Sequence, residues 1–276
     1  MEKADGRRIP NVLSIAGVDP SGGAGLLADV KTISSLGAYA CGVVTALTAQ
    51  STKTVSGIVD VPPAFITEQL ETLFDDVQID AVKIGMLSRP ETIGAVADAL
   101  QRHRPRFIVL DPVITAKSGA ALLQPEAVGA LKERLLPLCD VFTPNLPEAL
   151  ELLGEAGNLA VEAMPDAARR LLELTGGRGM VYLKGGHLAG SQMVDVVWDG
   201  REMRRLCSDR IDTRNTHGTG CALSSALAAL LPQCDDKWDA VVWAHDYLQQ
   251  AIQASDNLEV GTGHGPVDHF WRQRES

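Results

Sequence analysis

The chain has 276 residues, which suits one large α/β domain, and its 45% hydrophobic and 22% charged residues are typical of a globular protein with a core. Its formal net charge is −10, and Lys and Arg form no basic stripe, so we expect no nucleic acid as a partner. We also expect no membrane span, because no apolar run approaches the roughly 18 residues that a span needs.

Short runs of β-branched and apolar residues recur along the chain and predict strands. Several runs are apolar throughout, which is typical of strands that are buried on both faces of a parallel sheet. We expect strands at 12–16, 42–47, 81–84, 107–110, 140–143 and 180–183. Late in the chain, 193–198 followed by Asp199-Gly200 and a run from Arg201 predicts a hairpin.

Amphipathic segments lie between the predicted strands. We expect helices from Leu26 to Leu36 and from Ile93 to Leu100, and around 63–75, 124–135, 146–153, 164–175, 219–231 and 237–255. Strands that alternate with helices predict βαβ units and a doubly wound sheet. No linker, repeat or low-complexity segment divides the chain, so residues 1–276 are expected to form a single domain.

The cysteines and the first residues bear on where the protein works. Five cysteines lie far apart and include no C-x-x-C pair, which predicts neither a disulfide framework nor a zinc site. The first eight residues carry no apolar segment of a secretory signal. Both features favour a reducing compartment, and we expect the cytoplasm.

Polar and glycine residues follow the predicted strands. In open parallel sheets, ligands bind beyond the carboxyl ends of the strands. The residues in these places are Gly17, Asp19, Ser21, Thr48, Gln50, Gly85, Met86, Asp111, Asn145, Glu148 and Lys184-Gly185-Gly186-His187. We therefore predict that the functional site lies at this edge of the sheet.

The first of these segments is the glycine-rich stretch 17–25, which leads into a helix but matches neither G-x-G-x-x-G nor a P-loop. It is either a tight turn or a backbone that a ligand approaches closely. Asp29 is expected in the first turn of that helix, where it either offsets the helix dipole or binds a ligand hydroxyl or amine. The amide of Gln50 suits the edge of a heteroaromatic ring.

The sharpest motif is Asn215-Thr216-His217-Gly218-Thr219-Gly220-Cys221, which opens a helix of small and apolar residues. Glycines before a helix leave its first N–H groups open, and these groups bind anions. We expect the same positive end to lower the pKa of Cys221 and to make it a general base. The alternative is a buried structural cysteine.

Two further features have paired interpretations. Asn145-x-x-Glu148 offers oxygen ligands suited to Mg²⁺, or a capping box. Lys184 either reaches a phosphate or is an exposed charge at a strand end. The histidines show no metal-ligand spacing, and we expect most of them at the surface. They are His103, His187, His217, His245, His264 and His269.

Together these segments resemble the ribokinase superfamily, and within it the bacterial hydroxymethylpyrimidine/phosphomethylpyrimidine kinases. The matching segments are 15–17, 19–25, 28–32, 45–50, 83–87, 111–113, 116–119, 143–148, 184–187, 217–221 and 258–261. Leu26-Leu27 departs from the pattern, where a more polar helix start is usual. The resemblance implies a ribokinase-like, doubly wound, mostly parallel sheet with helices on both faces.

The resemblance also implies an activity. ATP would phosphorylate 4-amino-5-hydroxymethyl-2-methylpyrimidine to its monophosphate and then to its diphosphate, in thiamine biosynthesis, with Mg²⁺ as cofactor and in a homodimer. Pyridoxal kinase of the same fold is the first alternative, since both substrates are small aromatic rings with a hydroxymethyl group. A non-catalytic pyrimidine-binding protein is the second.

Roles for single residues follow from the same resemblance. Cys221 takes the place of the Asp base of sugar kinases, and Gly218, Thr219 and Gly220 complete an anion hole with it. Gln50, Asp29, Met86, Val113 and Gly17 would bind the pyrimidine. Lys184, Asn145, Asp111, Lys117 and Thr216 would bind ATP and its phosphates, and Glu148 with Asn145 would hold Mg²⁺, partly through water.

Overall fold

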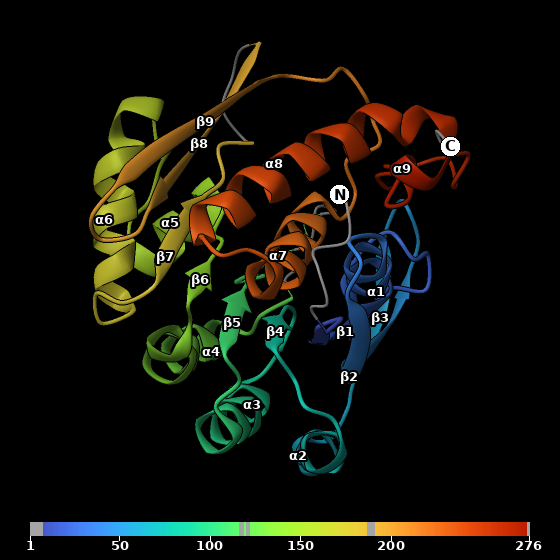
Figure 1. Ribbon diagram of the computed structural model, residues 1–276, viewed down its shortest axis with the longest axis vertical. Helices are drawn as coiled ribbons and strands as arrows, with labels where there is room; N and C mark the ends of the chain where they lie inside the picture. Colours follow the sequence, from blue (N-terminus) through green and yellow to red (C-terminus); the bar gives the residue numbers. More distant parts are fainter. Residues whose placement is uncertain (1–7, 116–118, 120–121, 187–190, 275–276) are drawn as a thin grey trace.

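A computed structural model describes residues 8–115, 119, 122–186 and 191–274. Within these residues the strands form one nine-stranded sheet in the order β3-β2-β1-β4-β5-β6-β7-β8-β9 (Figure 1). The strands are β1 Asn11–Val18, β2 Tyr39–Gln50, β3 Val55–Asp60, β4 Ala81–Ile84, β5 Phe107–Leu110, β6 Val141–Phe142, β7 Met180–Leu183, β8 Gln192–Trp198 and β9 Met203–Asp209.

The central strands β2, β1, β4, β5, β6 and β7 run parallel, and antiparallel strands border them on both sides. β3 pairs antiparallel with β2, and the hairpin of β8 and β9 extends the sheet beyond β7. β1 lies between β2 and β4, so the winding of the chain reverses there. Such a reversal opens a crevice at the carboxyl ends of the strands. The predicted doubly wound, mostly parallel sheet is confirmed.

Helices cover both faces of the sheet (Figure 1). They are α1 Gly25–Ser35, α2 Pro63–Asp76, α3 Pro90–His103, α4 Pro125–Ala130, α5 Leu146–Leu153, α6 Met164–Leu174, α7 Thr219–Leu230, α8 Lys237–Gln253 and the short α9 Trp271–Arg274. α1, α7 and α8 pack on one face, and α2 to α6 pack on the other. No helix in the described part of the chain combines the length and the apolar character that crossing a membrane requires.

Alternation along the strands builds two apolar layers. In β1, Leu13 and Ile15 join the core beneath α2 to α6, while Val12 joins the core beneath α1, α7 and α8. In β4, Val82 and Ile84 enter the first core, and Lys83 between them faces the second side fully buried. Each buried aliphatic side chain contributes about 1.5–3 kcal/mol. A buried lysine in such a strand needs a counter-charge, which the site below supplies.

The structure differs from the sequence-based elements at β3, at 124–135 and at the hairpin loop, and the short α9 was not predicted. β3 was not predicted, because most of its residues are exposed and it shows no apolar run. The expected helix at 124–135 divides into α4 and a π-helical turn at Leu131–Leu135. The hairpin loop is longer than Asp199-Gly200, because Trp198 pairs with Met203, and the Asp199 carboxylate accepts the N–H groups of Arg201 and Glu202.

Candidate active site

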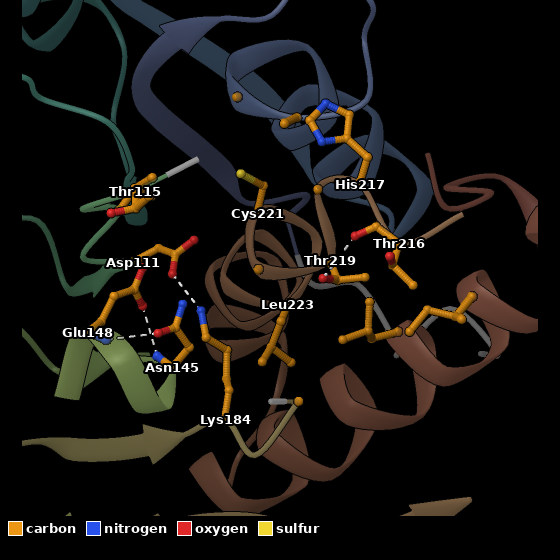
Figure 2. A pocket seen from close by; sticks show the side chains of 18 of the residues that line it. Asp111, Thr115, Asn145, Glu148, Lys184, Thr216, His217, Thr219, Cys221 and Leu223 are labelled. Carbon is orange, nitrogen blue, oxygen red and sulfur yellow. Dashed lines mark hydrogen bonds and ion pairs between the residues drawn. The ribbon is translucent and has the colours of Figure 1, made fainter. Parts of the chain in front are cut away.

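A cavity of about 1040 Å³ opens at the carboxyl ends of the parallel strands. Figure 2 shows side chains from separate segments of the chain that converge on it. The predicted site residues that line it are Gly17, Gln50, Met86, Asp111, Val113, Asn145, Glu148, Lys184, Thr216, Gly218, Thr219, Gly220 and Cys221. Asp29 is not among the lining residues, and Lys117 and His187 lie outside the described residues.

The loop between β1 and α1 folds around the carboxylate of Asp19. This carboxylate accepts the Ser21 N–H at 2.8 Å, the Ser21 hydroxyl at 2.9 Å and the Ala24 N–H at 3.1 Å. Gly25 has φ +58°, and a Cβ there would overlap the carbonyl oxygen of Gly17. The glycine-rich segment therefore serves as a tight turn and as a wall of the cavity, because Gly17, Ala24 and Gly25 line it.

His217 joins this loop to the start of α7. Its Nε2 lies 2.7 Å from Oδ2 of Asp19, and both side chains are buried or nearly so. Burial raises the pKa of the Asp19 carboxyl, but hydrogen bonds from His217 and Ser21 outweigh burial and hold that pKa below its ordinary value. This pair was not predicted from the sequence, because no local pattern connects two residues that are 198 positions apart.

The expectation that most histidines lie at the surface was wrong. His217 lines the cavity, and His245 and His269 are buried. His103 is partly buried and stacks on Phe74. The tertiary fold covers these side chains, and a lone histidine in a sequence carries no signal for it.

The glycines of the motif allow close approach at the start of α7. Gly218 has φ +77°, and a Cβ there would overlap the carbonyl oxygen of Gly23. A Cβ on Gly220 would lie 3.2 Å from Nζ of Lys184 and 3.3 Å from Oδ2 of Asp111. No side chain caps the helix, and Gly218, Thr219 and Gly220 line the cavity, so the N–H groups at this helix start remain available for an anion.

Cys221 lies in the first turn of α7 and is partly exposed to the cavity. The expected lowering of its pKa was wrong. Burial raises the pKa of the thiol to about 11, and this outweighs the lowering by the Lys83 ammonium and by the N–H of Gly25. The helix start favours the thiolate, but removal from water disfavours it more.

Asp29 does not have the position that either expectation gave it. It is the fifth residue of α1, fully buried, with Lys83 Nζ at 2.9 and 2.8 Å from its two carboxylate oxygens. The hydroxyl of Ser14 donates to one oxygen and that of Ser225 to the other. Four donor contacts saturate this carboxylate, so it has no lone pair turned toward a ligand. Lys83 lines the cavity instead, and its one sequence signal was a lysine inside a buried strand.

A second polar cluster lies at the ends of β5, β6 and β7. Nζ of Lys184 contacts Oδ1 of Asp111 at 2.8 Å, and Figure 2 shows the two side chains pointing toward one another beside Asn145 and Glu148. Oδ1 of Asn145 accepts the N–H of Glu148 at 2.9 Å, and Oε2 of Glu148 accepts the N–H of Asn145 at 2.8 Å. The capping box is thus present.

This cluster has the chemistry to hold Mg²⁺. Burial raises the pKa of Glu148 to about 7, the Lys184 charge lowers it, and the Asp111 carboxylate raises it. A cation would relieve the repulsion between these two buried carboxylates. The described residues contain no cluster of three His, Cys, Asp or Glu side chains able to form a metal cage. The donor set fits an ion that keeps most of its waters and shares phosphate oxygens.

Gln50, Gly17 and Met86 form another part of the cavity lining. Gln50 lies at the end of β2, where its Oε1 accepts the Thr48 hydroxyl at 3.2 Å and its Nε2 lies 3.5 Å from Nε2 of His217. A Cβ on Gly17 would lie 3.2 Å from the sulfur of Met86, so the glycine leaves space beside that thioether. An amide beside apolar walls is suited to a small heteroaromatic ring.

A buried network supports the loop after β7 and was also missed. The Asp195 carboxylate accepts the Gly185 N–H at 2.7 Å and the Tyr182 hydroxyl at 2.9 Å. The Tyr182 hydroxyl also lies 3.0 Å from Nδ1 of His245 on α8. The network fixes the backbone next to Lys184.

Comparisons with known proteins agree with this geometry. The family described as "Phosphomethylpyrimidine kinase" matches residues 19–268. The hydroxymethylpyrimidine/phosphomethylpyrimidine kinase of Escherichia coli (strain K12) is 48% identical over 260 residues, which cover 94% of this chain and 97% of the relative.

Solved structures give the same picture. The phosphomethylpyrimidine kinase of Clostridium difficile 630 is 38% identical, with a TM-score of 0.76 over 88% of this chain and 99% of that chain. The ADP complex of Bacillus subtilis pyridoxal kinase is 32% identical, with a TM-score of 0.87 over 96% and 99%. The family match over most of the chain, with the E. coli relative, shows that this chain belongs to the phosphomethylpyrimidine kinase family.

Proposed function

We propose that this protein transfers the γ-phosphoryl group of ATP first to the hydroxymethyl group of 4-amino-5-hydroxymethyl-2-methylpyrimidine and then to the resulting monophosphate, in thiamine biosynthesis. The observation that carries the proposal is a single cavity lined by Gln50, by Lys184 and Asp111, and by Cys221 at the start of α7. The names of the relatives support the same substrates.

The part of the cavity beside Gln50 would hold the pyrimidine ring and so set the position of the hydroxymethyl group that accepts the phosphoryl group. The Gln50 amide offers a donor and an acceptor side by side, which complements a ring nitrogen and its neighbouring amino group. Met86 supplies an apolar contact beside Gly17, and Val113 is a further apolar residue of the cavity lining. A ring held beside Gln50 would direct its hydroxymethyl group toward the start of α7.

Cys221 takes the hydroxyl proton during the first transfer. A thiol with its pKa near 11 is mostly protonated at neutral pH, but its thiolate is a strong base once formed. The open N–H groups of Gly218, Thr219 and Gly220 bind the charge that develops on the transferred phosphoryl group. Lys184 and Thr216 add positive and hydrogen-bonding contacts for the ATP phosphates.

Glu148 and Asn145 would hold Mg²⁺, mostly through water, beside Lys184 and Asp111. Bound there, the ion would neutralise phosphate charge, which is the main requirement of phosphoryl transfer. Lys184 already balances the charge of Asp111 at 2.8 Å, so the carboxylate of Glu148 remains for the cation.

Pyridoxal kinase is the second candidate, and one observation favours it. The Bacillus subtilis pyridoxal kinase structure superposes over nearly the whole chain. Its identity of 32% is below the 48% of the E. coli pyrimidine kinase, so the pyrimidine remains the first choice.

Assembly and location are part of the proposal. Exposed apolar side chains on β2 and β3, namely Leu47, Ile58 and Val59, support a homodimer that pairs this edge of the sheet with a second copy. A molar mass near 59 kDa by light scattering is expected for the dimer of this 29.4 kDa chain. The use of ATP with Mg²⁺ supports a cytoplasmic location. A molar mass near that of one chain would contradict the homodimer.

The test is product analysis with Mg-ATP and the hydroxymethyl-pyrimidine. Phosphorus NMR should show a phosphomonoester that appears first and a diphosphate that replaces it. A protein that binds the pyrimidine by calorimetry but forms neither phosphate would be a non-catalytic binding protein. A protein that neither binds nor phosphorylates the pyrimidine would contradict the proposal altogether.

A further inference from the structure

A fully buried ion pair lies at the base of the active-site cavity. Lys83 on β4 and Asp29 on α1 have no exposed side-chain surface, and Nζ of Lys83 contacts both carboxylate oxygens of Asp29. Burying two charges is costly, and an apolar pair of similar size stabilises a fold as well or better. The pair therefore calls for a role beyond stability.

The pair is hydrogen-bonded to the helix that carries Cys221. The Ser225 hydroxyl donates to Asp29 at 2.8 Å, and Ser225 follows Cys221 by four residues on α7. Residues four apart lie on the same face of a helix. The face of α7 that presents the thiol is thus the face that contacts the ion pair.

Lys83 is the member of the pair that lies beside the cavity, and its side chain is fully buried there. Lys83 lines the cavity, whereas Asp29 does not. The ammonium of Lys83, which has three N–H donors, contacts both oxygens of Asp29. A Cβ on Gly85 would lie 2.8 Å from Nζ, so the glycine keeps space beside the ammonium.

Burial and several charged groups on different segments influence the pKa of Cys221. Burial raises the pKa of the thiol most, and Lys83 is the largest influence that lowers it. Asp29 and Asp111 raise it by smaller amounts, and the N–H of Gly25 lowers it. Lys184 is a further cation that interacts with the thiol.

We propose that Lys83 is a positioning residue for phosphoryl transfer: held by Asp29, it presents a fixed positive charge to Cys221 and stabilises the thiolate that accepts the proton. The part of this inference that concerns catalysis rests on the proposed function. The contact of the ion pair with the helix that carries Cys221 does not depend on that function.

The test measures the thiolate directly. Iodoacetamide alkylates the thiolate, so the alkylation rate of the Cys221 peptide, followed by mass spectrometry at pH 8.5 without substrate, reports its population. Lys83→Met should slow alkylation about tenfold or more. This corresponds to a rise of about one unit or more in the pKa of the Cys221 thiol. Asp29→Asn should slow it as well, because a fully buried ammonium that has lost its counter-charge gives up its proton. Ser14→Ala removes a hydrogen bond to Asp29 but no charge, and should leave the rate within about twofold.

Slower alkylation of a variant whose circular dichroism spectrum is unchanged is what a merely structural ion pair would not give. If Lys83→Met alkylates at the wild-type rate or faster, the proposal is wrong. If either single variant fails to fold by circular dichroism, the neutral double variant Lys83→Met/Asp29→Asn decides. It should alkylate more slowly than wild type, since the Lys83 influence exceeds that of Asp29; an unchanged or faster rate would overturn the proposal. Failure of pyrimidine turnover would defeat the proposed function and leave this thiol result intact.

Discussion

Nε2 of His217 lies 2.7 Å from Oδ2 of Asp19, and this contact ties the loop after β1 to the loop that opens α7. The first loop forms one wall of the cavity, and the second carries Cys221. Gln50 lies beside the same histidine, with 3.5 Å between Nε2 of each side chain. The Asp19–His217 pair thus joins the β1–α1 loop and the neighbourhood of Gln50 to the start of α7.

Asp19→Asn should lower the free energy of unfolding. Losing a hydrogen bond to a charged group costs about 1.5–3 kcal/mol. Because the pKa of Asp19 is held below its ordinary 3.8, its contribution to stability is full above pH 4 and is lost as the pH falls through the folded-state value. Urea unfolding should show wild type more stable than the variant at pH 6, with a gap that narrows below about pH 4. A gap that stays constant with pH would contradict the pairing.

Gln50→Ala should weaken binding of the hydroxymethyl-pyrimidine about tenfold, because one or two hydrogen bonds to the ring are lost. Isothermal titration calorimetry measures the change, and ATP binding should not move. Gln101→Ala on the exposed surface of α3 is the matched control. Equal pyrimidine affinity in wild type and Gln50→Ala would remove the ring-binding role.

Cys221→Ala should affect the two phosphorylations unequally. The hydroxymethyl group must lose a proton, and loss of a general base costs 10²–10⁴-fold in rate. A phosphate acceptor, with its second pKa near 6, is already ionised at neutral pH. The first kcat should therefore fall by about 10² or more and the second by much less, with pyrimidine affinity nearly unchanged.

Separate assays on the pyrimidine and on its monophosphate compare the two steps. Cys234→Ala is the control, since this cysteine lies outside the cavity. Equal losses in both steps would show that Cys221 acts through the anion hole rather than as a base. A normal first kcat would remove it from the mechanism.

Glu148→Gln should change how stability depends on pH. The folded-state pKa of Glu148 is raised to about 7 from its ordinary 4.5, so its contribution is present below pH 4.5 and is lost as the pH rises through 7. With a chelator present, thermal unfolding should show the variant gaining stability relative to wild type between pH 5 and pH 8. Glutamine keeps an oxygen for the capping box, so the two proteins should be similar at pH 5. Parallel curves would contradict the raised pKa.

Much of the fold could be predicted, because buried parallel strands and amphipathic helices leave local periodic patterns. The helix at 146–153 was predicted with the bounds that the structure shows. β3 and the π-helical turn at Leu131–Leu135 were missed, since one is an exposed edge strand and the other continues a helical pattern. Tips of successive strands meet by topology alone, which is why most predicted site residues share one cavity.

What could not be predicted depends on contacts across the sheet. Asp29 has the sequence of a helix-start carboxylate, but Lys83, 54 residues away, takes both of its oxygens. The pKa of Cys221 depends on how much water the tertiary fold excludes, and the motif around it says only that a helix begins there. Asp195 and Tyr182 support the loop after β7 because the hairpin of β8 and β9 pairs with β7 and brings their side chains together.

The most direct test of the central claim compares kcat/KM in an ATP-coupled assay on the hydroxymethyl-pyrimidine, its monophosphate and pyridoxal. We expect turnover of both pyrimidines, with a lower kcat/KM for pyridoxal than for either of them. A higher kcat/KM for pyridoxal than for the pyrimidine would contradict it, and would assign the same cavity to vitamin B6 phosphorylation.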